Sequence, residues 1–188
     1  MQSWALSGRC SIGALDAKHI LIVLDSEEDA RKVLAHPMRK LGHSLFRIFR
    51  WSMDFNTKSE PTATTSWVRL PSLPPALNNP RYIESIVSSF GKFLAVDKRT
   101  RSFTNPNYAR VCMEIDSTKD MLEEVWIATG PNVGFWQTII YESRLQYCLK
   151  CKLHGHDISN CRKNKKRQEE EQKIWAARDD HGLPIIPL

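Results

Sequence analysis

The 188-residue sequence lacks any run of about 18 apolar residues, so it predicts no transmembrane helix. Residues 1–13 hold a single cation, Arg9, and no long apolar stretch, so no secretory signal peptide is expected. We therefore expect an intracellular protein of the nucleus or the cytoplasm, neither secreted nor bound to a membrane. In such a reducing compartment the five cysteines, an odd number, are not expected to form a disulfide framework.

The sequence also lacks the motifs that mark most enzymes. It has no phosphate-binding loop, no nucleophile elbow and no pair of carboxylates placed for acid–base chemistry. Its length leaves room for one ordinary domain and a small appendage, which is too short for a polymerase, a helicase or a kinase. We therefore expect a binding protein rather than an enzyme.

The composition provides enough apolar material for a core, together with an excess of cations. Apolar residues make up 41% and aromatic residues 9% of the chain, so most of it is expected to fold. Lys and Arg number 27 against 21 Asp and Glu, which gives a formal charge of +6. This excess favours a polyanionic partner.

Strand and helix patterns alternate along most of the chain, which predicts an α+β sandwich. Residues 52–64 are polar and are expected to form a linker or long loop. Trp51 and Trp67 are expected in the core rather than as stacking platforms. The predicted strands are 19–24, 44–51, 65–70, 92–97, 108–115, 124–129 and 134–141; the predicted helices run from Ser26 to Pro37 and from Pro80 to Ser89, with a helical turn at 117–122.

After Tyr141 the strand pattern stops, and Cys, His and Lys become frequent. This change divides the chain into an α+β domain over residues 1–142, a metal-binding module over residues 143–163, and a charged, flexible tail over residues 164–188. The segment 162–173 is wholly polar, and it is either a solvated helix or a disordered tail.

Four residues of the module have the spacing Cys-x2-Cys-x4-His-x4-Cys, namely Cys148, Cys151, His156 and Cys161. Three thiolates and one imidazole close a tetrahedral Zn²⁺ site and leave no position for a catalytic water. Gly155 permits the backbone reversal that returns His156 to the ion. The sequence therefore predicts one structural zinc.

Three other interpretations of these residues stand beside the zinc site. The cysteines could be unligated thiols in a basic tail. Cys148 and Cys151 could form a redox pair, although such pairs usually follow a strand and open a helix. His154 could replace His156 as a ligand, but this would leave Gly155 unexplained, so we expect His154 to face solvent.

At these residues the chain resembles the CCHC zinc knuckle of retroviral nucleocapsids and retrotransposon proteins, which holds single-stranded nucleic acid. The resemblance implies that a base lodges beside Leu149 and Ile158, which could equally form the small core of the knuckle. Tyr147 could add a stacking face, but the bulky aromatic usual after the first cysteine is absent, so weaker or less selective binding is expected. The cations expected to hold phosphates, and to make binding sensitive to salt, are Lys150, Lys152, Arg162, Lys163, Lys165, Lys166 and Arg167.

Five further segments recur in this order in one family: Phe49-Arg50-Trp51 with Asp54-Phe55, Trp67 to Pro74, Val96-Asp97, Ala109 to Asp116, and Tyr141-Glu142. They resemble a plant domain of unknown function found ahead of a CCHC knuckle in proteins derived from LINE-type retrotransposons. The resemblance implies a body similar to the RNA-recognition motif (RRM), with its first strand and helix missing and hence an N-terminally truncated copy. The predicted strand 108–115 lacks the aromatic pair by which an RRM reads RNA, so the sheet is expected to be a scaffold.

These observations predict a gag-like, retrotransposon-derived protein that binds single-stranded RNA or DNA in a zinc-dependent manner. The alternative is a protein-interaction module that uses the knuckle and the tail, with a protein partner or a second copy of the chain. The basic run at residues 162–167 is either a nuclear localisation signal or an ordinary solvated segment.

Overall fold

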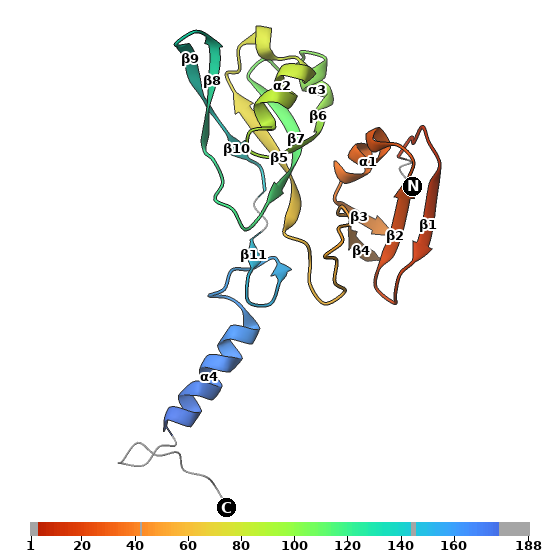
Figure 1. Ribbon diagram of the computed structural model, residues 1–188, viewed down its shortest axis with the longest axis vertical. Helices are drawn as coiled ribbons and strands as arrows, with labels where there is room; N and C mark the ends of the chain where they lie inside the picture. The colour runs from red at the N-terminus through yellow and green to blue at the C-terminus, as the bar shows by residue number, and fades with distance from the viewer. Residues whose placement is uncertain (1–3, 42, 144–145, 177–188) are drawn as a thin grey trace, which may run out of the picture.

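The computed structural model describes residues 4–41, 43–143 and 146–176, which form a mixed α/β fold with antiparallel sheets (Figure 1). One sheet has four strands, and the others are two-stranded hairpins. No helix in the described part of the chain is long and apolar enough to cross a membrane. The elements are β1 (Cys10–Ala14), β2 (Ile20–Leu24), α1 (Glu27–Leu34), β3 (Met38–Leu41), β4 (Ser44–Arg47), β5 (Ala63–Pro71), the 3₁₀ turn η1 (Pro75–Leu77), α2 (Pro80–Val87), β6 (Lys92–Val96), α3 (Lys98–Arg101), β7 (Tyr108–Asp116), β8 (Glu124–Gly130), β9 (Val133–Thr138), β10 (Ile140–Tyr141), β11 (Tyr147–Cys148), β12 (Leu153–His154) and α4 (Arg162–Ala176).

The four-stranded sheet is the centre of the fold. Its strand order is β10–β5–β7–β6, and all neighbouring strands are antiparallel. The longest pairing joins β5 to β7, from Ala63 opposite Asp116 to Pro71 opposite Tyr108. Helix α2 connects β5 to β6, and the hairpin β8–β9 precedes β10 at the opposite edge (Figure 1). The two central strands therefore come from segments that the sequence predicts as strands.

One face of this sheet is covered by α2 and carries the main core. Val111, Met113 and Ile115 alternate along β7 and are buried on this face, as the sequence pattern predicts. Ile83 and Val87 of α2 are fully buried in the same cluster. Because burial of apolar surface is the dominant favourable term in folding, this layer is the stable part of the body.

The other face of the sheet is partly covered by the N-terminal segment. Leu34 of α1 packs against Leu94 and Cys112 of the sheet. The Oγ of Ser26 accepts from the backbone N–H of Asp29 and caps α1, so the predicted helix start is confirmed. Burial raises the pKa of the Cys112 thiol to about 12, so this cysteine stays protonated and acts as a small apolar residue.

Several elements differ from those predicted. The predicted strand 44–51 ends with β4, residues 117–122 contain a turn and no helix, and the predicted strand 134–141 is divided into β9 and β10. The sequence pattern does not predict strands β1 and β3 or helix α3, because these elements are short and depend on their partners for stability. Residues 162–173, which the sequence allows as a helix or a disordered tail, lie in α4, and residues 177–188 lie outside the described residues.

The two tryptophans predicted to be core residues have different surroundings. Trp51 is 53% exposed, so its assignment to the core is wrong. Trp67 packs beside the cluster formed with α1, and the guanidinium carbon of Arg110 lies 4.0 Å from the centroid of its ring. Because Arg110 covers this ring, Trp67 offers no free stacking face on the sheet.

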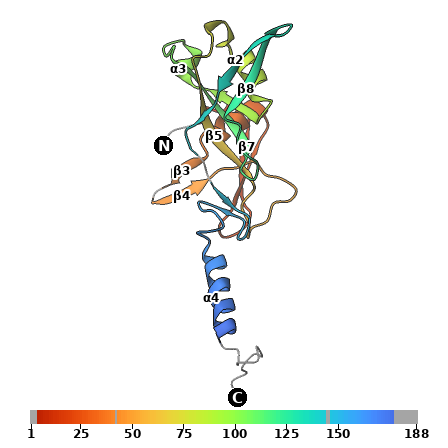
Figure 2. The same ribbon diagram turned by 90° about the vertical axis from the view of Figure 1, so that its left-hand side faces the viewer.

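Arg110 is held over Trp67 by two carboxylates. It lies 2.6 Å from Oε2 of Glu142 and 3.1 Å from Oδ1 of Asp97, and Arg69 lies 2.6 Å from Oε1 of the same Glu142. Hydrogen bonds from Arg110 and then Arg69 hold the pKa of Glu142 well below its usual range, at about 2. This network joins β5, β7 and the segment after β10 toward the end of the sheet where Pro71 pairs with Tyr108. Helix α4 lies beyond the opposite end of the sheet (Figure 2).

Replacement of Glu142 tests this network. Because the pKa of Glu142 is lowered in the folded state, its carboxylate stabilises the fold above the unfolded-state pKa, and this contribution is lost as the pH falls toward 2. We expect Glu142→Gln to lower the free energy of unfolding at pH 7 by about 1 kcal/mol, since partial solvent exposure screens the ion pairs. Urea denaturation at pH 7 and at pH 3, with Glu124→Gln on the exposed edge of β8 as control, should show a smaller difference at pH 3. An equal loss at both pH values would contradict the assignment.

Candidate metal centre

The module that contains the four candidate ligands begins with the hairpin of β11 and β12, beyond the end of the sheet (Figure 1). The backbone N–H of Lys152 donates to the carbonyl of Cys148 at 2.7 Å, which closes a tight turn between the two strands. Gly155 follows with a φ of 103°, in the left-handed region that glycine adopts without strain. The predicted backbone reversal at Gly155 is therefore confirmed, and it sends the chain back toward Cys161, directly before α4.

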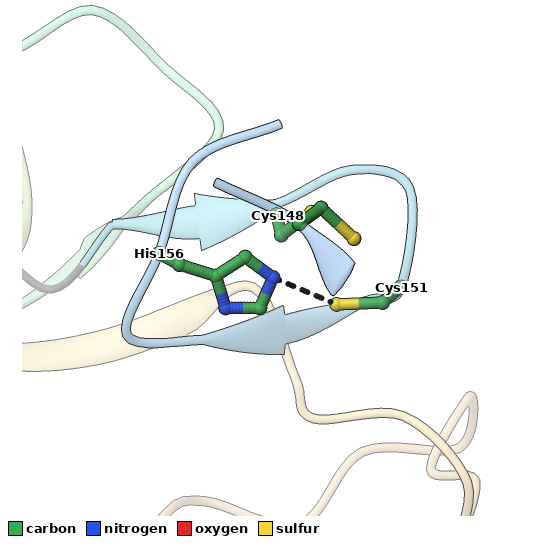
Figure 3. A group of neighbouring side chains, drawn as sticks. Cys148, Cys151 and His156 are labelled. Atoms are coloured by element: carbon green, nitrogen blue, oxygen red, sulfur yellow. Dashed lines mark hydrogen bonds between the residues drawn. The ribbon is translucent and has the colours of Figure 1, made fainter. Parts of the chain in front are cut away.

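The four predicted ligands lie together. One ligand atom from each of Cys148, Cys151, His156 and Cys161 lies within 4.8 Å of the others. The three cysteines are buried, and Nε2 of His156 lies 3.3 Å from Sγ of Cys151 (Figure 3). All of them are free thiols. These four residues could hold one metal ion, and three sulfurs with one imidazole nitrogen are a donor set that suits zinc in a closed, four-coordinate site.

Local hydrogen bonds favour the thiolate form of two of the cysteines. Burial acts to raise the pKa of Cys148, but the backbone N–H groups of Cys151 and Lys150 outweigh it and lower that pKa. Burial also opposes ionisation of Cys161, but hydrogen bonding with His156 lowers its pKa. Burial raises the pKa of Cys151. Because the thiolate is the form that binds a metal, a cation at the cluster would favour ionisation of all three sulfurs.

His154, the alternative ligand, lies outside the cluster of four. Its Nε2 lies 2.8 Å from the carbonyl oxygen of Pro61, and its ring packs edge-on against Tyr147 with 4.9 Å between the centroids. The side chain is half-buried, so the expectation that it faces solvent is wrong. The physical reason is a contact with a segment far away in the sequence, which no local pattern signals.

Glu60 attaches the module to the body through both its side chain and its backbone. Its Oε2 accepts from the backbone N–H of His154 at 2.6 Å and lies 3.0 Å from Nη1 of Arg47. Its backbone N–H donates to the carbonyl of Lys152 at 2.8 Å, and its carbonyl accepts from the hydroxyl of Tyr147 at 3.2 Å. The loop before β5, predicted as a linker, is therefore the surface on which the module docks.

The residues predicted to contact nucleic acid fall into two groups. Leu149 is 61% exposed and Ile158 is 45% exposed, so they do not form a core for the module, whose buried cluster consists of the three cysteines. Tyr147, Leu149 and Lys152 line a groove shared with the loop before β5. The second group consists of exposed cations at the start of α4, namely Arg162, Lys163, Lys165, Lys166 and Arg167. Lys150 is exposed on the turn of the hairpin.

One family model matches the first part of the chain. Residues 1–59 match DUF4283, a domain of unknown function. The match covers β1 to β4 and α1 and includes Trp51, but it contains none of the four clustered residues. Of the segments that carry the family resemblance, Phe49-Arg50-Trp51 with Asp54-Phe55 lies within it, and the later ones lie beyond it. No curated protein and no solved structure matches the chain.

Metal titration distinguishes the two histidines. We expect the full chain to bind one Zn²⁺, and His156→Ala to weaken that binding by about 100-fold or more because it removes a ligand. His154→Ala should change zinc affinity only a few-fold, since this side chain lies outside the cluster. Competition with a chromophoric chelator measures both values, and the absorption spectrum of the Co²⁺-substituted chain reports whether coordination stays tetrahedral. An equal loss in the two variants would contradict the ligand assignment.

Hydrogen exchange tests the attachment through Glu60. We expect Glu60→Ala to speed amide exchange at His154 by about tenfold or more, because a hydrogen bond to a charged group contributes roughly 1.5–3 kcal/mol. Mass spectrometry of the peptide that covers residues 150–156 measures this rate in the zinc-loaded chain. Glu60→Gln keeps an acceptor oxygen and should give a smaller effect. Unchanged exchange in Glu60→Ala would show that the carboxylate does not hold the module.

Proposed function

We propose that this protein binds single-stranded nucleic acid, RNA or DNA, through a zinc knuckle formed by Cys148, Cys151, His156 and Cys161. The observation that carries this proposal is the closed cluster of four ligand residues, followed directly by a helix whose first turns present exposed cations. Because all four ligands come from the protein, Zn²⁺ would serve a structural role and offer no catalytic position. We therefore propose a binding protein without enzymatic activity.

The exposed cations of α4 would provide the attraction to phosphates. Helix α4 projects away from the sheet, so residues 162–167 are open to a partner (Figure 1). Each phosphate that a Lys or Arg neutralises releases counterions from the nucleic acid, so affinity depends steeply on salt. Leu149 and Ile158 would add contacts to bases, since both are exposed apolar side chains next to the metal cluster.

The arrangement of the body supports a scaffold role. The order β10–β5–β7–β6, with α2 after β5, is similar to the split β-α-β arrangement of an RRM, and the hairpin β8–β9 takes the place of the second helix. An RRM reads RNA with aromatics on its open sheet face. Here α1 covers part of that face, and Trp67 lies beneath Arg110. We therefore assign no nucleic-acid contact to this face of the sheet.

A DUF4283 match ahead of a cluster of three cysteines and one histidine supports the wider role that the family resemblance implies. That role is a gag-like protein derived from a LINE-type retrotransposon of plants, which coats or chaperones nucleic acid. In this setting the protein would act in the nucleus or the cytoplasm, where single-stranded RNA or DNA of the element is present.

Fluorescence anisotropy of a labelled single-stranded oligonucleotide tests the proposal with the full chain. We expect binding that weakens strongly when zinc is removed by a chelator or when Cys148 is replaced by serine. The double variant Lys165→Ala/Lys166→Ala should reduce the slope of log affinity against log salt by about 0.7 for each phosphate that the variant no longer neutralises.

The matched control is Lys98→Ala, an exposed cation on α3, which lies at the opposite end of the body from the module (Figure 1). Its affinity and its salt slope should equal those of the wild type. If Cys148→Ser leaves binding unchanged at moderate salt, the zinc-dependent function is wrong.

A further inference from the structure

A groove of about 790 Å³ lies between the metal-binding module and the body. One wall is the loop from Arg50 to Ala63, and the other is formed by Tyr147, Leu149 and Lys152 of the hairpin β11–β12. The ends of β6 and β7 close the floor with Lys92, Glu114, Ile115 and Asp116. The groove therefore exists only where the module docks on the body.

Trp51 is the largest apolar side chain that lines the groove, and it is 53% exposed. The loop that carries it is fixed by Phe55, whose ring packs against Phe49 and against His19 with centroid distances of 5.9 Å and 5.5 Å. The backbone N–H of Phe55 also donates to the carbonyl of Ser52 at 3.0 Å. An indole on an ordered loop, half open to a groove, is a preformed stacking surface.

Several of the charged side chains that line the groove are held in ion pairs, either with each other or with residues outside it. Nε of Arg50 lies 3.1 Å from Oε2 of Glu114, and Arg50 forms a second ion pair with Glu27. Glu60 forms an ion pair with Arg47. In the described part of the chain no ion pair involves the ammonium of Lys152 or the carboxylate of Asp54, both of which line the groove. The groove thus offers the indole ring of Trp51, the exposed side chain of Leu149, the ammonium of Lys152 and the carboxylate of Asp54.

This set of groups fits an unpaired nucleobase with its phosphate. A base is flat and neutral, so it can stack on Trp51 and lie against Leu149, and its amino groups can donate to a carboxylate such as that of Asp54. The phosphate that follows the base would meet the ammonium of Lys152. The four carboxylates of the lining, Asp54, Glu60, Glu114 and Asp116, make the groove unsuited to several phosphates at once, which favours one base over a backbone path.

We propose that this groove is a base-binding site in which Trp51 of the body, together with Leu149 of the knuckle, holds one base of a single strand. The proposal rests on the proposed function and deepens it, because it makes the body a direct participant in binding. Glu60 would then affect base binding as well as docking, because its contacts hold the hairpin wall against the loop wall.

The test measures the affinity of the zinc-loaded full chain for a labelled single-stranded oligonucleotide at fixed salt. We expect Trp51→Ala to weaken binding by about 5- to 100-fold, the range that removal of one base-aromatic stack produces. Trp51→Phe should restore most of the affinity, and the salt slope should stay that of the wild type in both variants. Trp136→Ala is the matched control, because Trp136 is 63% exposed on β9 and does not line the groove.

Zinc stoichiometry and far-ultraviolet circular dichroism of Trp51→Ala show whether the variant is folded, and Trp51→Phe provides a second test if it is not. As a further measurement, the oligonucleotide should quench tryptophan fluorescence in the wild type and in Trp136→Phe, but much less in Trp51→Phe. If the wild type shows no zinc-dependent binding, the proposed function fails. If the wild type binds and Trp51→Ala binds equally well, the groove proposal alone is overturned.

Discussion

The convergence of four candidate ligand atoms within 4.8 Å of one another is the constraint on which the module, the start of α4 and the groove all depend. Three buried thiolates would repel one another unless a cation lay among them. A bound ion would satisfy them and fix the path of the chain from Cys148 to Cys161, which includes the reversal at Gly155. The exposed positions of Leu149 and Ile158 follow from this path, because they lie on the loops between ligands.

A few polar contacts join the module to the body, so the geometry of the candidate ligand cluster is coupled to the loop before β5. Glu60 holds both strands of the hairpin, and Arg47 holds Glu60. The wall opposite the hairpin is ordered by Phe55 and its ring contacts. Where an ion is bound, its loss would therefore alter the groove as well as the module, even though none of the four candidate ligands comes from the body. The sheet supports this arrangement, since its own aromatic surface is covered by α1 and Arg110.

The sequence predicted best what depends on local spacing. The separation of the four clustered residues along the chain predicts their convergence. The alternation and helical spacing of apolar residues predict β5, β7 and α2. The positions of Trp51, Glu60 and His154 could not be found in this way, because their surroundings come from segments up to about 94 residues away. Tryptophan is usually buried, so the sequence places Trp51 in the core. Its place beside the groove depends on the docked module, which the local sequence does not signal.

X-ray absorption at the zinc edge of the purified full chain tests the metal centre most directly. The account predicts one zinc per chain, surrounded by three sulfur atoms and one nitrogen atom at the usual distances of about 2.3 Å and 2.0 Å. The nitrogen should remain in His154→Ala and disappear in His156→Ala. A chain that retains no zinc after purification in its presence, or a shell with a different number of sulfurs, would contradict the assignment of the four ligands.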